Sequence, residues 1–170
     1  ALAGNKRAWL KLVTRYEKSI FNYAYRMVSN RDDAMDLMQE IFLSVFRNLS
    51  SYRGEGSFKG WLFRIANYRC IEFYRRKKPQ QGLDDVPELE NENPQFCPES
   101  MTQMAQQGGN LVEAMQQLPL NQKAVVELKF FESFTFDEIA DQLGISSNTA
   151  KSRLYSALTK LKSLLEVQHV

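Results

Sequence analysis

The sequence has few residues of the kinds that bind metals or form disulfides. Its two cysteines, Cys70 and Cys97, lie far apart without CxxC spacing, and His169 is the single histidine. These three side chains do not make a zinc site, because structural zinc needs four suitably spaced ligands. We therefore expect no bound metal, and the sparse cysteine favours a reducing compartment such as the cytoplasm.

Long apolar runs and catalytic motifs are also absent from the sequence. The apolar runs are short, so we expect no membrane-spanning helix and no signal-peptide core. Without a phosphate-binding glycine loop, a metal cluster or a nucleophile–base pair, we expect no catalytic residue, no cofactor and no enzymatic activity. At 170 residues, of which 44% are hydrophobic and 25% charged, the chain can bury one core or two small ones.

Charge and proline content divide the chain into three blocks. Residues 1–78 contain 16 Lys and Arg against 7 Asp and Glu, a net charge of +9, whereas residues 79–110 contain 6 acidic and no basic side chains. Residues 111–170 are nearly neutral, with 6 basic and 7 acidic side chains. Four of the five prolines lie in the middle block, which has no hydrophobic period. We interpret it as an extended acidic linker between two domains, 5–78 and 111–170.

Outside the linker, apolar residues recur at the period of α-helices, which predicts an all-α protein with two small helical domains. In the first domain we expect helices over 9–27, from about Asp32 to Leu49, and from about Ser57 to Lys78. The expected core side chains are Leu12, Val13, Tyr16, Ile20, Tyr23, Ala24 and Met27, then Ala34, Leu37, Met38, Ile41, Phe42, Val45, Phe46 and Leu49, then Leu62, Ala66, Cys70 and Phe73.

The faces opposite these core stripes are candidates for binding. On the second helix that face carries Asp36, Gln39, Glu40, Leu43 and Arg47. It could be an ordinary solvated face, but an exposed leucine among acids and an amide favours a docking surface. On the third helix the outer face carries Arg64, Asn67, Tyr68, Ile71, Arg75 and Lys78, with Trp61 at its edge. Interleaved cations, amides and rings are typical of single-stranded nucleic acid binding, although a solvated basic helix end would also show cations.

The stretch "FTFDEIADQLGISSNTAKSRLYSALTKLK" predicts a helix-turn-helix. Thr135 and Glu138 form a capping box, Gly144 permits the turn, and Ser146 can cap the next helix. That helix would present Asn148, Lys151, Ser152 and Tyr155 to the major groove, where lysine can read guanine and asparagine adenine. A simple helical hairpin without a DNA function is the alternative.

Three stretches, "DDAMDLMQEIF", "GWLFRIANYRCIEFYRR" and "LPLNQKAVVELKFFESFTFDEIADQLGISSNTAKSRL", resemble regions 2.2, 2.3–2.4 and 4 of the extracytoplasmic-function (ECF, group IV) sigma factors of bacterial RNA polymerase. The resemblance extends from about Leu10 to Leu165. It implies that the chain binds the β′ clamp helices and β flap of core polymerase, captures melted −10 DNA with region 2 and reads −35 duplex with region 4. It also implies an anti-sigma factor as a partner and a linker that threads toward the RNA exit channel. A passive tether whose acidity only aids solubility is the alternative for the linker.

The resemblance assigns roles to residues of this sequence. The docking surface would be Asp36, Gln39, Glu40 and Leu43. The −10 surface would be Ser51, Tyr52 and Arg53 in the loop 50–59, with Trp61, Arg64, Asn67, Tyr68, Ile71, Arg75 and Arg76. The −35 surface would be Ser147, Asn148, Thr149, Lys151, Ser152, Arg153 and Tyr155. Tyr68 stands where family members often carry Asn, and Glu72 replaces a frequent Asp, so the preferred −10 bases stay open.

Two other functions are compatible with part of the sequence. A response-regulator-type activator shares the helix-turn-helix pattern and would bind DNA as a homodimer without polymerase, but it leaves the first 78 residues without a role. A helical interaction scaffold or enzyme is the more remote alternative, because no acid–base constellation stands out.

Overall fold

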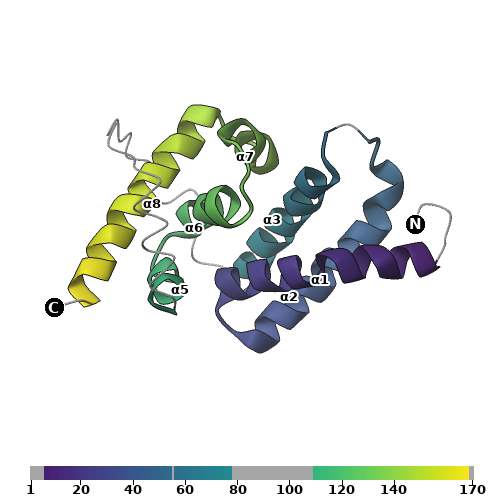
Figure 1. Ribbon diagram of the computed structural model, residues 1–170, viewed down its shortest axis with the longest axis horizontal. Coiled ribbons are helices and arrows are strands. Elements are labelled where there is room, and N and C mark those ends of the chain that lie inside the picture. Colours follow the sequence, from purple (N-terminus) through teal and green to yellow (C-terminus); the bar gives the residue numbers. More distant parts are fainter. Residues whose placement is uncertain (1–5, 55, 78–108, 169–170) are drawn as a thin grey trace. The chain divides into compact units, whose positions relative to one another are not determined.

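The computed structural model describes residues 6–54, 56–77 and 109–168 of the chain (Figure 1). Contacts between residues divide the chain into two compact units, 1–80 and 81–170. Every regular element in the described ranges is a helix, which confirms the all-α prediction. Among those helices we find none with a stretch long and apolar enough to traverse a bilayer. The predicted linker lies outside the described residues, apart from its last two residues, which begin a helix.

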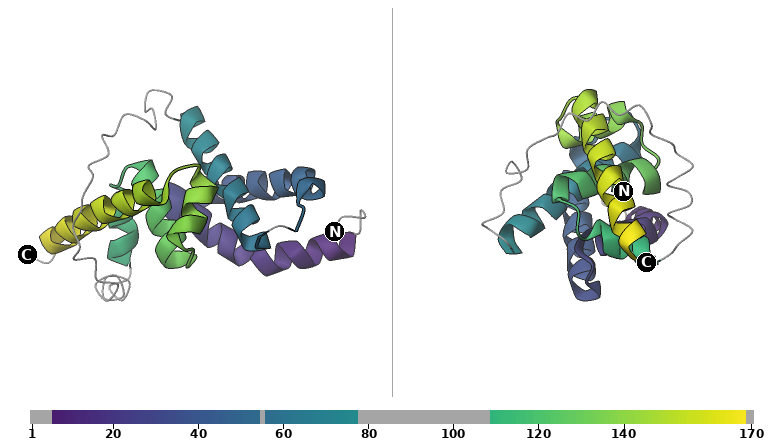
Figure 2. Two further views of the ribbon diagram at one scale, coloured as in Figure 1. Left: turned by 90° about the horizontal axis from the view of Figure 1, so that it is seen from above. Right: turned by 90° about the vertical axis from the view of Figure 1, so that its left-hand side faces the viewer.

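The first unit is a bundle of three long helices, visible from three sides in Figures 1 and 2. Helix α1 spans Lys6–Val28, α2 spans Arg31–Asn48 and α3 spans Phe58–Lys77, with a 3-10 turn η1 at Leu49–Ser51. Helix α2 packs against both α1 and α3, which touch each other less extensively. The centre of the unit is therefore the inward face of α2.

The start of α2 is fixed by a cap that sequence reasoning overlooked. The side-chain oxygen of Asn30 accepts a hydrogen bond of 3.0 Å from the backbone N–H of Asp33. Asp32 and Asp33 then lie in the first turn, where the positive end of the helix dipole favours carboxylates. The acids were found in the sequence, whereas the cap was not.

Most of the predicted core of the first unit is buried, but Phe46 is not. Its side chain is 59% exposed, and its ring lies 5.2 Å from the half-buried ring of Trp9. The apolar stripe of α2 is wider than the surface that α1 covers, so the residue at the stripe's edge stays in water. The prediction that Phe46 belongs to the core is therefore wrong.

Asn67 is the second correction, because it faces the core rather than solvent. It is 3% exposed, and its Oδ1 accepts a hydrogen bond of 2.7 Å from the buried Tyr23 hydroxyl. Asn67 lies four residues after Phe63 and three before Cys70, which places it on the inward stripe of α3. The tyrosine donor satisfies Asn67 Oδ1 and so lowers the free-energy cost of burying this side chain.

The second unit is built around its C-terminal helix. It contains α5 (Gly109–Met115), α6 (Leu120–Val126), the π-helical turn η2 (Glu127–Phe131), α7 (Phe136–Leu143) and α8 (Ser147–Gln168). Helix α8 packs against α5, α6 and α7. Its inward residues Ala150, Leu154, Ala157, Leu161 and Leu165 are buried, and Leu158 is half-buried. The outward side of α8 is thus left free of the core.

Replacing Tyr23 by Phe tests the buried hydrogen bond. The substitution keeps the ring but leaves Asn67 Oδ1 without its donor, so we expect the free energy of unfolding to fall by about 1–3 kcal/mol. Chemical denaturation followed by circular dichroism measures this difference. Tyr25→Phe is the matched control, because Tyr25 is 42% exposed and should tolerate the change. Equal stability of the two variants would contradict the role of the hydrogen bond.

Candidate docking and nucleic-acid surfaces

The outer side of α2 carries the docking face, which we define as Asp36, Gln39, Glu40 and Leu43. Asp36 and Gln39 are exposed, and Leu43 is 54% exposed even though it is a large apolar side chain. The core of the unit lies on the opposite side of the helix. The structure therefore brings the four predicted residues together on a surface that packing does not use.

Glu40 is held in place by a cation from α3. Both carboxylate oxygens of Glu40 accept hydrogen bonds from Arg76 Nη2, at 2.8 and 2.7 Å. This hydrogen bonding raises the pKa of the Arg76 guanidinium. Two turns earlier on α2, Asp33 pairs with Lys77 Nζ at 2.5 Å. The end of α3 is thus tied to α2 by two ion pairs, one of which involves the docking face.

This pairing separates Arg76 from the other predicted −10 residues. Arg76 lies twelve residues after Arg64, which on an α-helix corresponds to a rotation of about 120°. It consequently points along the α2 side of α3, next to Glu40, and not along the face of Arg64. The resemblance grouped Arg76 with the −10 surface, whereas the structure places it beside the docking face.

The outer side of α3 forms the strand face, which we define as Arg64, Tyr68, Ile71 and Arg75. Arg64 and Arg75 are exposed, Tyr68 is 58% exposed and Ile71 is half-buried. The guanidinium of Arg69 lies 5.6 Å from the centroid of the Tyr68 ring, and Arg75 approaches Glu72 at 3.5 Å. Lys78, predicted on this face, lies outside the described residues. What remains is an exposed ring between cations.

An aromatic cluster lies where the loop 50–59 enters α3. The ring of Tyr52 is 5.4 Å from Phe58 and 5.2 Å from Trp61, and the Phe58 and Trp61 rings are 5.5 Å apart. The fourth ring comes from α1, where Tyr16 lies 5.5 Å from Phe58. All four side chains are half-exposed. Sequence reasoning found Tyr52 and Trp61, but it placed Tyr16 in the core and missed Phe58.

Local hydrogen bonds hold the described residues of the loop beside this cluster. Ser51 Oγ donates a 2.6 Å hydrogen bond to the carbonyl of Asn48, and the Tyr52 hydroxyl donates to the carbonyl of Gly56 at 3.4 Å. Gly54 and Gly56 adopt positive φ angles of 76° and 73°, a conformation that glycine reaches without strain. Arg53, which lies between η1 and Gly54, is exposed.

The helix-turn-helix is formed as the sequence predicted. Thr135 Oγ1 accepts from the backbone N–H of Glu138 at 3.2 Å, and Glu138 Oε1 accepts from the N–H of Thr135 at 3.0 Å. Gly144 ends α7 in the left-handed conformation, with φ of 67°. Ser146 Oγ accepts from the N–H of Thr149 at 3.0 Å and so caps α8. Local capping therefore sets the geometry of this motif.

On the outward side of α8, some side chains are exposed and others are held by side-chain hydrogen bonds. Asn148 and Lys151 are exposed, while Ser152, Arg153 and Tyr155 are half-exposed. Ser147 Oγ donates to Asp137 Oδ1 at 2.6 Å, and Ser146 Oγ donates to Thr149 Oγ1 at 2.9 Å. The Ser147 hydroxyl therefore joins α8 to α7, and the Thr149 hydroxyl bonds the cap residue Ser146. The side chains best placed to reach a ligand are those of Asn148 and Lys151.

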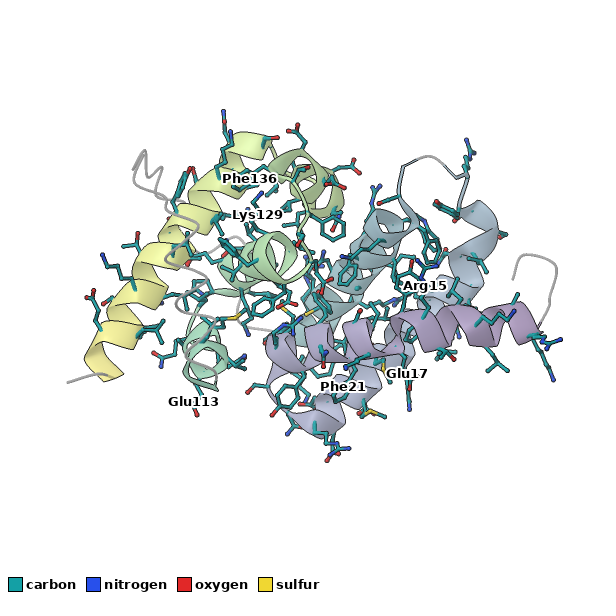
Figure 3. The ribbon with its side chains drawn as sticks, viewed as in Figure 1. Arg15, Glu17, Phe21, Glu113, Lys129 and Phe136 are labelled. Atoms are coloured by element: carbon teal, nitrogen blue, oxygen red, sulfur yellow. The ribbon has the colours of Figure 1, made fainter. Side chains whose placement is uncertain are left out.

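Lys129 is a candidate binding residue that sequence reasoning missed. Its Nζ lies 4.5 Å from the ring centroid of Phe136, and the Nζ of Lys151 lies 5.7 Å from the same ring (Lys129 and Phe136 are labelled in Figure 3). Lys129 belongs to η2, whose widened turn is not visible in a 3.6-residue pattern. Two cations thus converge beside the first residue of α7, where the helix dipole also attracts anions.

The buried titratable groups of the first unit serve packing. The Tyr74 hydroxyl donates to the carbonyl of Met27, and burial, with a smaller effect of Cys70, raises the pKa of Tyr74. Cys70 is a buried thiol. Across the described residues, no group of three or more His, Cys, Asp or Glu could hold a metal ion. The surfaces above are therefore suited to binding through charge and stacking.

Two family models match the chain, one in each unit. The model of Sigma-70 region 2 matches residues 12–80, and the model of Sigma-70 region 4 matches residues 109–161. The chain is 31% identical over 161 residues to the ECF RNA polymerase sigma factor SigE of Mycolicibacterium smegmatis, covering 93% of this chain and 62% of that protein. It is 29% identical over 150 residues to the RNA polymerase sigma factor SigV of Bacillus subtilis, covering 88% and 86%.

Two solved structures of protein complexes contain a chain with the same fold. CnrH in complex with the cytosolic domain of CnrY matches with a TM-score of 0.69 at 22% identity, covering 98% of this chain and 92% of that one. RpoE of Bartonella quintana in complex with the anti-sigma factor NepR matches with a TM-score of 0.71 at 22% identity, covering 95% and 98%. With the region 2 and region 4 matches in the order that the sequence motifs predicted, the chain belongs to the ECF sigma factors, which are alternative sigma factors for transcription initiation.

Proposed function

We propose that this chain binds core RNA polymerase in the cytoplasm and directs it to promoters through separate surfaces for −10 and −35 DNA, with no catalytic activity of its own. The observation that carries the proposal is the docking face, which leaves a large apolar side chain in water where the fold gains nothing from it. We assign this face to the β′ clamp helices and the second unit to the β flap. The domain boundaries 5–78, 79–110 and 111–170 are part of the proposal.

Capture of the melted −10 strand would use the strand face of α3 and the loop 50–59. Unstacking a base costs a few kcal/mol, and stacking on an aromatic ring returns about 1–3 kcal/mol per base. Tyr68 offers such a ring between Arg64 and Arg75, which can contact the neighbouring phosphates. Because these contacts are available only to an open strand, binding energy shifts the equilibrium toward the melted promoter.

Reading of the −35 duplex would use the start of α8. Asn148 and Lys151 are exposed on its first turns, where side chains of a recognition helix reach base edges. Lys129, beside Lys151, would contact the adjacent phosphate backbone. A homodimeric activator would use the same helix but would give no role to residues 6–77, which lie in a separate compact unit that carries both proposed binding faces.

The acidic linker and an anti-sigma partner complete the proposal. Six carboxylates without a cation in residues 79–110 suit a basic channel that otherwise holds RNA. The structural relative RpoE was solved with an anti-sigma factor, which supports an inhibitor of that class for this chain. We place such an inhibitor over the surfaces that bind polymerase.

Leu43→Ser tests docking without disturbing the fold. Leu43 is 54% exposed, so the change should leave thermal unfolding nearly unaltered while weakening the affinity for core polymerase about tenfold, through lost apolar burial. Competition binding to core polymerase measures the effect. Leu10→Ser is the matched control, since Leu10 is 62% exposed and lies on α1. A reversed charge at Glu40 would be less clean, because it would also repel Arg76. Wild-type affinity for Leu43→Ser would remove the docking face from the proposal.

Alanine substitution of Lys129 and Lys151 separates phosphate contacts from base readout. For Lys129→Ala in holoenzyme, we expect affinity to fall equally for all −35 sequences, with the slope of log K against log salt reduced by about 1. For Lys151→Ala we expect a loss of about 1–3 kcal/mol and a relaxed preference at one upstream position. Lys162→Ala, an exposed lysine further along α8, is the control. If neither variant differs from the control, α8 does not enter the groove as proposed.

Tyr68→Ala tests strand capture. Loss of the ring should reduce the fraction of open complexes formed by the holoenzyme, while recruitment through −35 contacts is retained. The defect should shrink on a template mismatched around the −10 element, because unpairing no longer opposes binding. Permanganate footprinting on both templates measures this. An equal defect on duplex and mismatched templates would mean that Tyr68 contributes general affinity instead.

A further inference from the structure

We propose that the surface for single-stranded promoter DNA continues from α3 onto α1, where Tyr16 binds a base of the strand adjoining the −10 segment, and Arg15 and Lys11, about 100° and about 140° around the helix from Tyr16, bind its phosphates. The inference rests on the proposed function and extends it to a helix to which neither the sequence motifs nor the family resemblance assigned a DNA contact. We call this surface of α1 the α1 face.

The aromatic cluster connects the two helices without a gap. Tyr16 of α1 lies 5.5 Å from Phe58, and Phe58 lies 5.5 Å from Trp61 at the start of α3. A fully apolar core would bury these rings, yet each is half-exposed. A base stacked at Trp61 or Tyr52 therefore has a next ring within reach on α1, so the stacking surface does not end at the loop.

Cations accompany the rings on the α1 face. The guanidinium of Arg15, labelled in Figure 3, lies 5.6 Å from the centroid of the Tyr16 ring. Lys11, Arg15 and Lys18 are all exposed, and they recur at spacings of four and three residues. Such spacings keep side chains on one side of a helix, with a rise of about 6 Å between Lys11 and Arg15. They thus form a row that can follow a phosphate backbone.

The row lies opposite the core and is separated from the nearest acid of α1. The buried residues of α1 are Ile20, Tyr23, Ala24 and Met27, which face α2 and α3. Glu17, also labelled in Figure 3, follows Arg15 by two residues and so projects about 160° away from it. The α1 face consequently presents positive charge without its own counter-ion, which favours a polyanion as the occupant.

The half-exposed rings decide which polyanion fits. Duplex DNA or an acidic protein could satisfy the cations, but neither offers unpaired bases to Tyr16 and Phe58. Single-stranded DNA satisfies both, because cations follow its phosphates while rings stack on its bases. Exposed Arg53 in the adjoining loop continues the same alternation of charge and ring.

The experiment measures binding of single strands to the holoenzyme. A promoter is first selected from random DNA, and its −10 strand is prepared in a short form and with single-stranded extensions on the 5′ or the 3′ side. We expect one extension to raise the affinity on the order of tenfold. In the double variant Lys11→Gln/Arg15→Gln this gain in affinity should be lost. The slope of log K against log salt for the extended strand should fall by about 1.4, while the affinity for the short strand should stay unchanged.

Matched variants separate a contact from a general field. Lys160→Gln/Lys162→Gln removes the same charge from exposed positions of the second unit and should keep the gain, because the probes lack a −35 duplex. Tyr16→Leu should reduce the gain several-fold, whereas Tyr25→Leu, at an exposed position on the same helix, should not. Thermal unfolding of both leucine variants shows whether the first unit stays folded.

Three results would overturn the inference. One is a wild-type holoenzyme that binds the short strand but gains nothing from either extension, in which case the proposed function still stands. Another is an equal gain from a duplex extension, which would mean that only the phosphates are bound. The third is retention of the gain in both Lys11→Gln/Arg15→Gln and Tyr16→Leu, which would assign the α1 face to another anion, such as an acidic protein. Failure of the wild-type holoenzyme to bind even the short strand would instead refute the proposed function, and this inference with it.

Discussion

The packing of α2 between α1 and α3 is the constraint on which the first unit depends. Its inward residues Leu37, Ile41 and Val45 are fully buried, and this burial fixes the rotation of the helix about its axis. Once that rotation is set, Asp36, Gln39 and Leu43 must point outward. The same contact orients α3, whose inward stripe meets α2 and whose strand face is left to solvent. The positions of the binding surfaces therefore follow from how the core is filled.

Sequence reasoning succeeded where the physics is local. The capping box at Thr135, the left-handed Gly144 and the Ser146 cap each depend on residues within one turn, so the helix-turn-helix could be predicted in detail. The docking face followed from helical periodicity in the same way. Each of these features needs only the spacing of residues along one helix.

The failures occurred where a residue's position depends on another element. Asn67 was placed on the outer face with Arg64, yet it lies on the inward stripe of α3, where Tyr23, 44 residues earlier, supplies a donor for its buried oxygen. Arg76 was assigned to the −10 surface by the resemblance, a role that stays a prediction, and in the fold its ion-pair partner is Glu40 on α2. Phe46 was expected inside, although α1 does not cover it. Tyr16, Phe58 and Lys129 acquire their significance from rings and cations that meet only in the folded chain.

The ion pair between Glu40 and Arg76 also bears on selectivity among partners. In the free chain the Glu40 carboxylate already has Arg76 as its counter-ion. A cation on a partner must replace Arg76, so binding gains only the difference between the free energies of the two ion pairs. Exposed ion pairs exchange at little net free energy, which makes positive charge alone a poor reason to bind here. Basic proteins and other abundant cations are thereby disfavoured competitors. Discrimination then falls to Leu43, whose burial requires a partner of complementary shape.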